Sequence, residues 1–305
     1  MNGTLSDRDW DDLVNLILER KCTPFIGAGA CANTLPLASD IAKQWAEAHG
    51  YPLTTSADDL SRVSQYVALT RYPMAPKEDL RRIFQKSPAP NFEAPDEPHA
   101  LLADLDLPIY ITTNYDDFMA KALKSRGRAY VREFPRWNRF PEIEGMRSFF
   151  DSQPQDPRDP LGGKALVYHL HGHLDVLQSL VLTEDDYLDF LIKMTTDTKL
   201  VPAPVCAALA GTSLLFIGYS MADWNFRVLL RGLIGSLGAS LGYASIAVQL
   251  PPKGLSQAQQ RQAQEYLSEY FSHIQRLKFQ IYWGEGKAFT SELRRRWEAA
   301  RHATH

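Results

Sequence analysis

Four short apolar segments, each ending in small or polar residues, most constrain the fold of this 305-residue chain. Their sequences are FIGAGAC (25–31), ITTNYD (111–116), YHLHG (168–172) and LFIGYSMAD (215–223). A buried parallel strand has this pattern, and its carboxyl end presents residues to a ligand crevice. The segments supply glycines, an amide, a carboxylate and an imidazole. We therefore predict that they meet in a nucleotide site with its own acid–base group.

Strand-like and helix-like segments alternate along the rest of the chain, which predicts an α/β fold with a doubly wound, mainly parallel, Rossmann-like sheet. The predicted strands are 23–26, 108–112, 129–134, 164–170, 180–182, 213–217, 244–249 and 279–283. The predicted helices include 7–20, 57–70, 76–86, 183–194, 223–235, 256–274 and 287–300. We expect a Rossmann-like domain (1–35 and 99–305), an inserted helical subdomain (36–98) and a long surface insertion at 135–163.

Composition excludes several classes of protein. The net charge of −3 shows no basic excess, so direct nucleic-acid binding is not expected. No apolar run approaches the ~18 residues of a membrane span, and the acidic N-terminus does not resemble a signal peptide. Three cysteines without a CxxC pair predict neither a disulfide framework nor a zinc ribbon. We expect a soluble, cytoplasmic protein without a bound metal.

The first segment contains a glycine turn, Gly27-Ala28-Gly29-Ala30-Cys31. Glycines at the end of a strand permit positive φ angles and let backbone N–H groups approach a pyrophosphate. A dehydrogenase would also need a second strand about 20 residues later, ending in an acidic residue for the ribose. That stretch has a helical pattern instead (41–48). A tight turn that binds nothing is the alternative interpretation.

The second segment places Asn114 and Asp116 directly after a strand, at the start of a helix. Either side chain could cap that helix by accepting hydrogen bonds from its first N–H groups. A neutral amide can also donate to one oxygen and accept from a water molecule without titrating. The capping and functional interpretations are compatible with each other.

The third segment carries histidines at alternate positions, His169, His171 and His173. In a strand they would share one face, so a metal site is conceivable. No second group of ligating residues lies nearby in the sequence, and we prefer one functional histidine with two hydrogen-bonded neighbours. An unperturbed pKa near 6.5 would let it accept a proton at cellular pH.

The order Gly-Ala-Gly, Thr-Thr-Asn-x-Asp, His-Gly, Gly-x-Ser resembles the sirtuin family of NAD-consuming enzymes, from about Thr23 to Trp297. It is most similar to the zinc-free bacterial branch found in antiphage defence systems. The chain differs from the family pattern at two points. It has Cys31 where many sirtuins have serine, and it lacks the Ile-Pro-Asp-Phe-Arg-like segment of the protein deacylases.

The resemblance implies a role for each matching residue. Asn114 would orient water and the nicotinamide ribose with support from Asp116, and His171 would be the general base. The residues implied in NAD⁺ binding are Gly27, Ala28, Gly29, Ala30, Cys31, Thr113, Gly172, Gly218, Ser220 and Asp223. Asp223 could equally cap the helix that follows it.

These roles predict an NAD⁺ glycohydrolase that uses NAD⁺ as substrate, needs no metal and depletes NAD⁺ in antiphage defence. The alternatives are an NAD-dependent protein-lysine deacylase and a non-catalytic sensor of NAD or ADP-ribose. The deacylase is disfavoured because the zinc-binding cysteines are absent. We also expect a homo-oligomer and an activating protein partner, such as a HerA-type hexameric ATPase, a short Argonaute or a related sensor. The sequence does not determine the partner, the trigger, or whether the ADP-ribose product is hydrolysed or cyclised.

Overall fold

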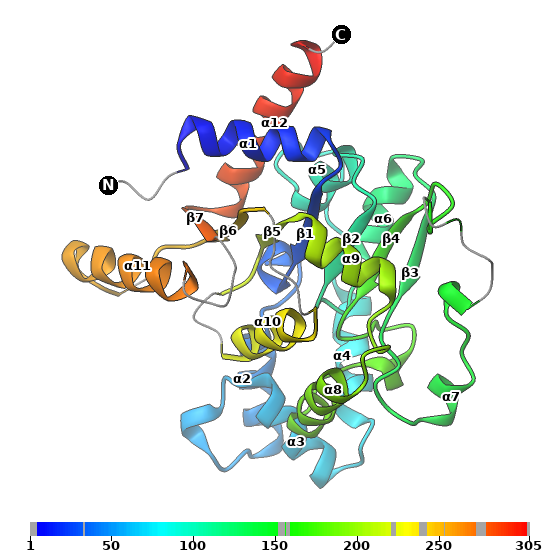
Figure 1. Ribbon diagram of the computed structural model, residues 1–305. Coiled ribbons are helices and arrows are strands. Elements are labelled where there is room, and N and C mark those ends of the chain that lie inside the picture. Colours follow the sequence, from blue (N-terminus) through cyan, green and yellow to red (C-terminus); the bar gives the residue numbers. More distant parts are fainter. Residues whose placement is uncertain are drawn as a thin grey trace.

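The computed structural model describes residues 5–32, 34–151, 156, 159–220, 224–237, 243–252, 254–272 and 279–303. Its centre is a seven-stranded sheet in the order β3-β4-β2-β1-β5-β6-β7, in which every neighbouring pair is parallel (Figure 1). The strands are β1 (Cys22–Ile26), β2 (Ile109–Thr112), β3 (Tyr130–Glu133), β4 (Ala165–His169), β5 (Ser213–Ile217), β6 (Ser245–Gln249) and β7 (Phe279–Trp283). The predicted doubly wound α/β fold is confirmed.

Helices cover both faces of the sheet because successive strand residues point to opposite sides. One face packs on α1 (Asp7–Leu18), α5 (Pro98–Asp104), α6 (Phe118–Ser125) and α12 (Gly286–Ala303). The opposite face packs on α8 (Glu184–Thr196), α9 (Ala203–Gly211), α10 (Trp224–Leu237) and α11 (Gln257–Ser272). The neighbours Phe25 and Ile26 show the alternation, since Phe25 lies in the second core and Ile26 in the first.

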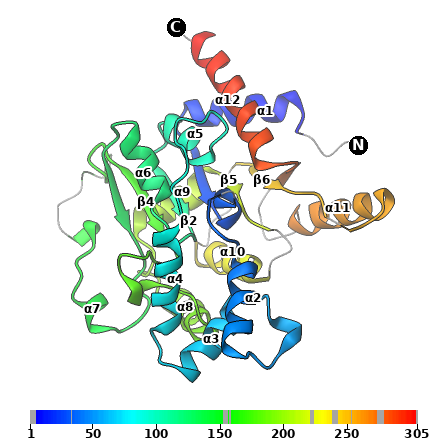
Figure 2. The same ribbon diagram turned by 180° about the vertical axis from the view of Figure 1, so that it is seen from behind.

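A third group of helices lies at the carboxyl end of the strands (Figures 1 and 2). It contains α2 (Ala38–His49), α3 (Leu60–Thr70) and α4 (Ala75–Lys86), and α2 ends at Gly50, which has a left-handed φ of 67°. These helices form a hydrophobic cluster that also includes Leu177, Leu180 and Leu182. The helical layer is therefore packed onto the segment that follows β4.

Some expected elements differ in the structure. Residues 180–182 do not form a strand, since the N–H groups of Leu180 and Val181 donate to the carbonyls of Leu177 and His171, and that of Leu182 donates to the side chain of Asp186. The insertion at 135–163 contains a short helix, α7 (Pro141–Glu144), and a buried Trp137 whose indole donates to the carbonyl of Ser179. Helices α5 and α9 were not expected, and α5 matters for the site below.

None of the helices in the described residues combines the length and the apolar character that a membrane span requires.

Candidate functional site

A pocket of about 620 Å³ lies between the carboxyl ends of the central strands and the helices α2, α3, α4, α8 and α10. In an open parallel sheet, ligands bind where the strand order reverses, which here is between β1 and β5. The predicted site residues that line the pocket are Ala28, Cys31, Thr113, Asn114, Asp116, His171, Gly218 and Ser220. The structure therefore brings residues of all four sequence segments together.

The glycine turn packs against the end of β5. The N–H of Gly27 donates to the carbonyl of Ile217 at 2.8 Å, and that of Gly29 donates to the carbonyl of Gly218 at 2.9 Å. Gly218 has a φ of +82°, and a Cβ there would lie 2.3 Å from the nitrogen of Ala30. The glycines thus allow the backbone of the turn and the backbone at the end of β5 to approach each other closely. The N–H groups of Gly27 and Gly29 already donate to these carbonyls. A diphosphate bound at the turn would therefore have to accept hydrogen bonds from other N–H groups of the turn.

Asn114 is held at the pocket wall from several directions. Its backbone N–H donates to the hydroxyl of Thr112 at 2.9 Å, and its carbonyl accepts from Nδ1 of His169 at 3.2 Å. Its side-chain Nδ2 donates to the carbonyl of Gly27 at 3.1 Å and lies 3.3 Å from Sγ of Cys31. The amide is therefore oriented before any ligand binds, as the proposed role in positioning water requires.

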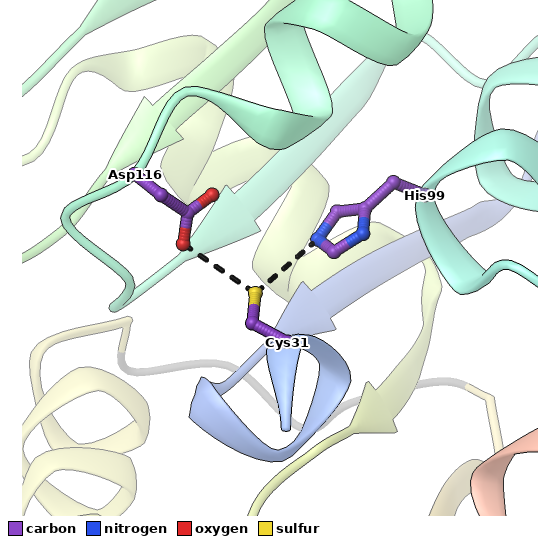
Figure 3. Close-up of side chains that lie close together, drawn as sticks. All are labelled: Cys31, His99 and Asp116. Carbon is purple, nitrogen blue, oxygen red and sulfur yellow. Dashed lines mark hydrogen bonds between the residues drawn. The ribbon is translucent and has the colours of Figure 1, made fainter. Parts of the chain in front are cut away.

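Asp116 bonds the start of the following helix, as one of its two interpretations predicted, and it also lies near the Asn114 amide. Its Oδ1 accepts from the N–H of Phe118 at the start of α6, at 2.9 Å. Its Oδ2 accepts from the Cys31 thiol at 3.5 Å (Figure 3). Cys31 therefore links the two side chains, because its Sγ contacts both the Asp116 carboxyl and the Asn114 amide. Burial raises the pKa of the Asp116 carboxyl, and it raises the pKa of the Cys31 thiol further.

The three histidines do not share one face, because β4 ends at His169. The rings of His169 and His173 lie 5.3 Å apart, whereas the ring of His171 packs edge-on against Tyr187 and Phe190. Of the three, only His171 lines the pocket, and its Nε2 is buried without a hydrogen-bond partner. The histidine chosen from the sequence is therefore the one that the structure places at the site.

Burial lowers the pKa of His171 to about 3, well below the unperturbed value assumed from the sequence. Its imidazole is consequently neutral at cellular pH in the ligand-free protein. It can accept a hydrogen bond from a water or ribose hydroxyl, but it is a weaker base than the sequence suggested.

Other predicted residues lie elsewhere. Gly172 is outside the pocket lining, and its φ of +77° serves a close approach to Ser179, because a Cβ would lie 2.3 Å from the Ser179 carbonyl oxygen. The expected approach of Gly172 to a ribose stays a prediction. Gly27, Gly29 and Ala30 also lie outside the lining. Asp223 falls outside the described residues.

Two site neighbours were missed by sequence reasoning. Tyr219 lines the pocket, and its hydroxyl donates to the carbonyl of Ile26 at 2.9 Å and lies 2.8 Å from the hydroxyl of Thr113. His99, on α5, has its Nε2 3.9 Å from Sγ of Cys31. The signal for α5 was Glu97 followed by Pro98, an acceptor at the cap and a proline at the first helical position.

A family model described as "SIR2-like domain" matches residues 108–274, which is over half of the chain. Similar curated proteins include three named NAD(+) hydrolase ThsA. The protein from Acinetobacter baumannii is 25% identical over 185 residues (56% of this chain, 32% of the relative). The proteins from Enterococcus faecium and Cytobacillus dafuensis are 26% and 28% identical, over 62% and 59% of this chain and 36% and 33% of the relatives.

The chain thus spans about a third of the length of these relatives. A similar solved structure is described as "Structural Basis for the Mechanism and Regulation of Sir2 Enzymes". It is 12% identical, with a TM-score of 0.43 over 98% of this chain and 100% of that chain.

Proposed function

Because the chain belongs to the family of SIR2-like domains, we propose that it is an NAD⁺ glycohydrolase that releases nicotinamide and ADP-ribose. The observation that carries the proposal is the joint placement of an oriented amide, Asn114, and a neutral imidazole, His171, in the wall of one pocket. The names of the curated relatives support the same activity.

In the proposed reaction, the bond between nicotinamide and the ribose breaks and nicotinamide leaves as a neutral molecule with the bonding electron pair. Positive charge develops on the ribose, and a water oxygen bonds to the same carbon. Asn114 orients this water, and His171 takes a proton from the water or from a ribose hydroxyl. Such a site accelerates the reaction mainly by positioning and by stabilising charge.

Two alternative activities use the same pocket. A protein-lysine deacylase would also release nicotinamide, but only together with an acyl-lysine substrate. A sensor would bind NAD⁺ or ADP-ribose without turnover. The presence of both Asn114 and His171 in the pocket wall favours the hydrolase over the sensor, because a sensor would need neither a water-positioning amide nor a proton acceptor.

Nicotinamide release by the purified chain, with and without an acetylated peptide, tests the proposal. We expect stoichiometric nicotinamide and ADP-ribose without the peptide. Release only in its presence would support the deacylase. NAD⁺ binding without release, also at high protein concentration and with the candidate partners, would support the sensor. Chromatography of the second product separates ADP-ribose from its cyclic form.

We further propose that the protein depletes NAD⁺ in antiphage defence and that assembly controls it. Rapid unregulated loss of NAD⁺ would kill the host cell, so a trigger is needed. The candidates for this trigger are assembly with a second copy of the chain and binding of a partner such as a HerA-type ATPase or a short Argonaute.

We also propose that 36–98 is an inserted subdomain. Its helices α2, α3 and α4 supply pocket residues, so their movement could open or complete the site.

Regulation by assembly predicts that turnover per chain rises with protein concentration or on addition of the partner. Turnover and particle mass should be measured together over a dilution series. High turnover by a dilute monomer would contradict this regulation without affecting the proposed chemistry.

A further inference from the structure

Three side chains from distant parts of the sequence converge at the pocket wall (Figure 3), where Cys31 and Asp116 line the pocket and His99 lies behind them. Cys31 comes from the turn after β1, His99 from the first turn of α5, and Asp116 from the segment after β2. One ligand atom of each lies within 4.8 Å of the others, and all three residues are buried. The proposed hydrolysis uses neither His99 nor the thiol of Cys31 as a reacting group.

The distances in this cluster match those of a metal site. Zinc binds sulfur at about 2.3 Å and nitrogen or oxygen at about 2.0–2.2 Å, so tetrahedral ligands are separated by about 3.6 Å. Sγ of Cys31 lies 3.9 Å from Nε2 of His99 and 3.5 Å from Oδ2 of Asp116. The two distances to sulfur therefore need shifts of only a few tenths of an ångström to hold an ion, and the ligand atoms of His99 and Asp116 lie within 4.8 Å of each other.

The surroundings of His99 also fit a metal ligand. Its Nδ1 lies 2.7 Å from Oε1 of Glu97, whose Oε2 accepts from the N–H of Ala100 at 2.5 Å. Nδ1–H donation to a carboxylate leaves the lone pair of Nε2 facing Cys31. A metal-binding histidine almost always donates its second ring N–H in this way, which fixes its tautomer and orientation.

The cluster is rich in acidic groups and has no lysine or arginine to balance them. In the described part of the chain, Glu97 has an ion pair with His99 alone, and no lysine or arginine forms an ion pair with Asp116. Two buried carboxyl groups and a thiol are costly to ionise together. A divalent cation would offset that cost.

We propose that Cys31, His99 and Asp116 bind a zinc-class divalent ion, with Glu97 orienting His99 and water in the fourth position. The sulfur, nitrogen and oxygen donors favour Zn²⁺ over Mg²⁺ or Ca²⁺. Binding replaces the thiol proton, which is released to solvent. Sequence reasoning, which sought cysteine pairs and a local histidine cluster, did not expect this site.

Metal binding would also inhibit the enzyme, and this part of the inference rests on the proposed function. Nδ2 of Asn114 lies 3.3 Å from Sγ of Cys31. A metal-bound thiolate is a stronger acceptor than a thiol, so it would draw this amide toward the sulfur and away from the orientation in which its oxygen meets the reacting water. Zinc should therefore reduce nicotinamide release.

Cobalt titration of the chelator-treated chain tests the site independently of activity. We expect one Co²⁺ per chain, an absorption band from thiolate-to-cobalt charge transfer, and competition by Zn²⁺. Cys31→Ser should abolish the band, and Glu97→Gln should weaken binding by about 10- to 100-fold. Cys206→Ser is the matched control, because this half-buried thiol bonds the carbonyl of Val201 and should leave the titration unchanged.

Circular dichroism shows which variants are folded. If Cys31→Ser does not fold, the isosteric variant Asp116→Asn takes its place in the cobalt titration. Absence of stoichiometric binding, or an unchanged band in folded Cys31→Ser or Asp116→Asn, would overturn the site. Binding without loss of nicotinamide release would overturn the inhibitory role alone. If the chain binds cobalt but its chelator-treated form releases no nicotinamide, even at high protein concentration and with the candidate partners, the proposed function is contradicted instead.

Discussion

Replacing Asn114 with alanine should abolish nicotinamide release while the protein stays folded. The side-chain amide is buried, bonds the Gly27 carbonyl and is positioned next to Cys31 in the pocket wall. A single preorganised hydrogen-bond donor in an active site contributes about 100- to 1000-fold to kcat. A loss of at least ~100-fold is therefore expected if Asn114 orients the attacking water.

The measurement is the initial rate of nicotinamide release, with circular dichroism and thermal unfolding as checks on the fold. Removing the amide costs the Gly27 carbonyl one of its two donors, since the N–H of Ala30 still bonds it, so the loss of stability should be about 0.5–1.5 kcal/mol. Asn138→Ala is the matched control. Asn138 bonds a carbonyl of the short helix at Leu177–Ser179 and lies outside the pocket lining. A folded Asn114→Ala variant with a rate within a few-fold of the unaltered protein would remove Asn114 from the mechanism.

Replacing His171 with alanine should lower kcat by at least ~100-fold, as expected for loss of a general base. His173→Ala should have a mild effect, because His173 lies outside the pocket lining and packs against Phe134 and His169. The comparison is well matched, since both residues are buried histidines of one turn. Equal losses in two folded variants would contradict the separate role of His171 and would revive a metal site built from the histidines.

The pH dependence follows from the direction of the pKa shift. Burial lowers the pKa of His171 to about 3, so the active, neutral imidazole predominates at all higher pH values. Protonation would abolish activity only as the pH falls toward that value. We therefore expect a profile of kcat/KM without an inflection from His171 between pH 5 and 8. The contrary result would be a fall in kcat/KM as the pH drops below a value near 6.5, with no such fall in His171→Gln. It would show that His171 is hydrated in the free protein and keeps its ordinary pKa.

Much of the fold was predictable because it depends on local patterns. All seven observed strands were expected, with ends that differ by a residue or so, and the capping box of Ser6 with Asp9 marks the start of α1. The predicted strand at 180–182 was wrong. Its apolar residues pack with the helical layer, as the inclusion of Leu180 and Leu182 in that cluster shows. A short buried run has no periodicity that separates a strand from a packed loop.

For the site, the sequence determined the four segments, and their resemblance to the sirtuin motifs led to the choice of Asn114 and His171. Parallel strands bring their carboxyl ends to one edge, so residues that follow such strands must meet there. Only the tertiary structure decided what surrounds these side chains. The position of His99 beside Cys31 depends on how α5 packs, and the lowered pKa of His171 depends on its burial against Tyr187 and Phe190. Distances between residues far apart in the chain, and the removal of water from a side chain, are properties of the packed molecule that no local pattern contains.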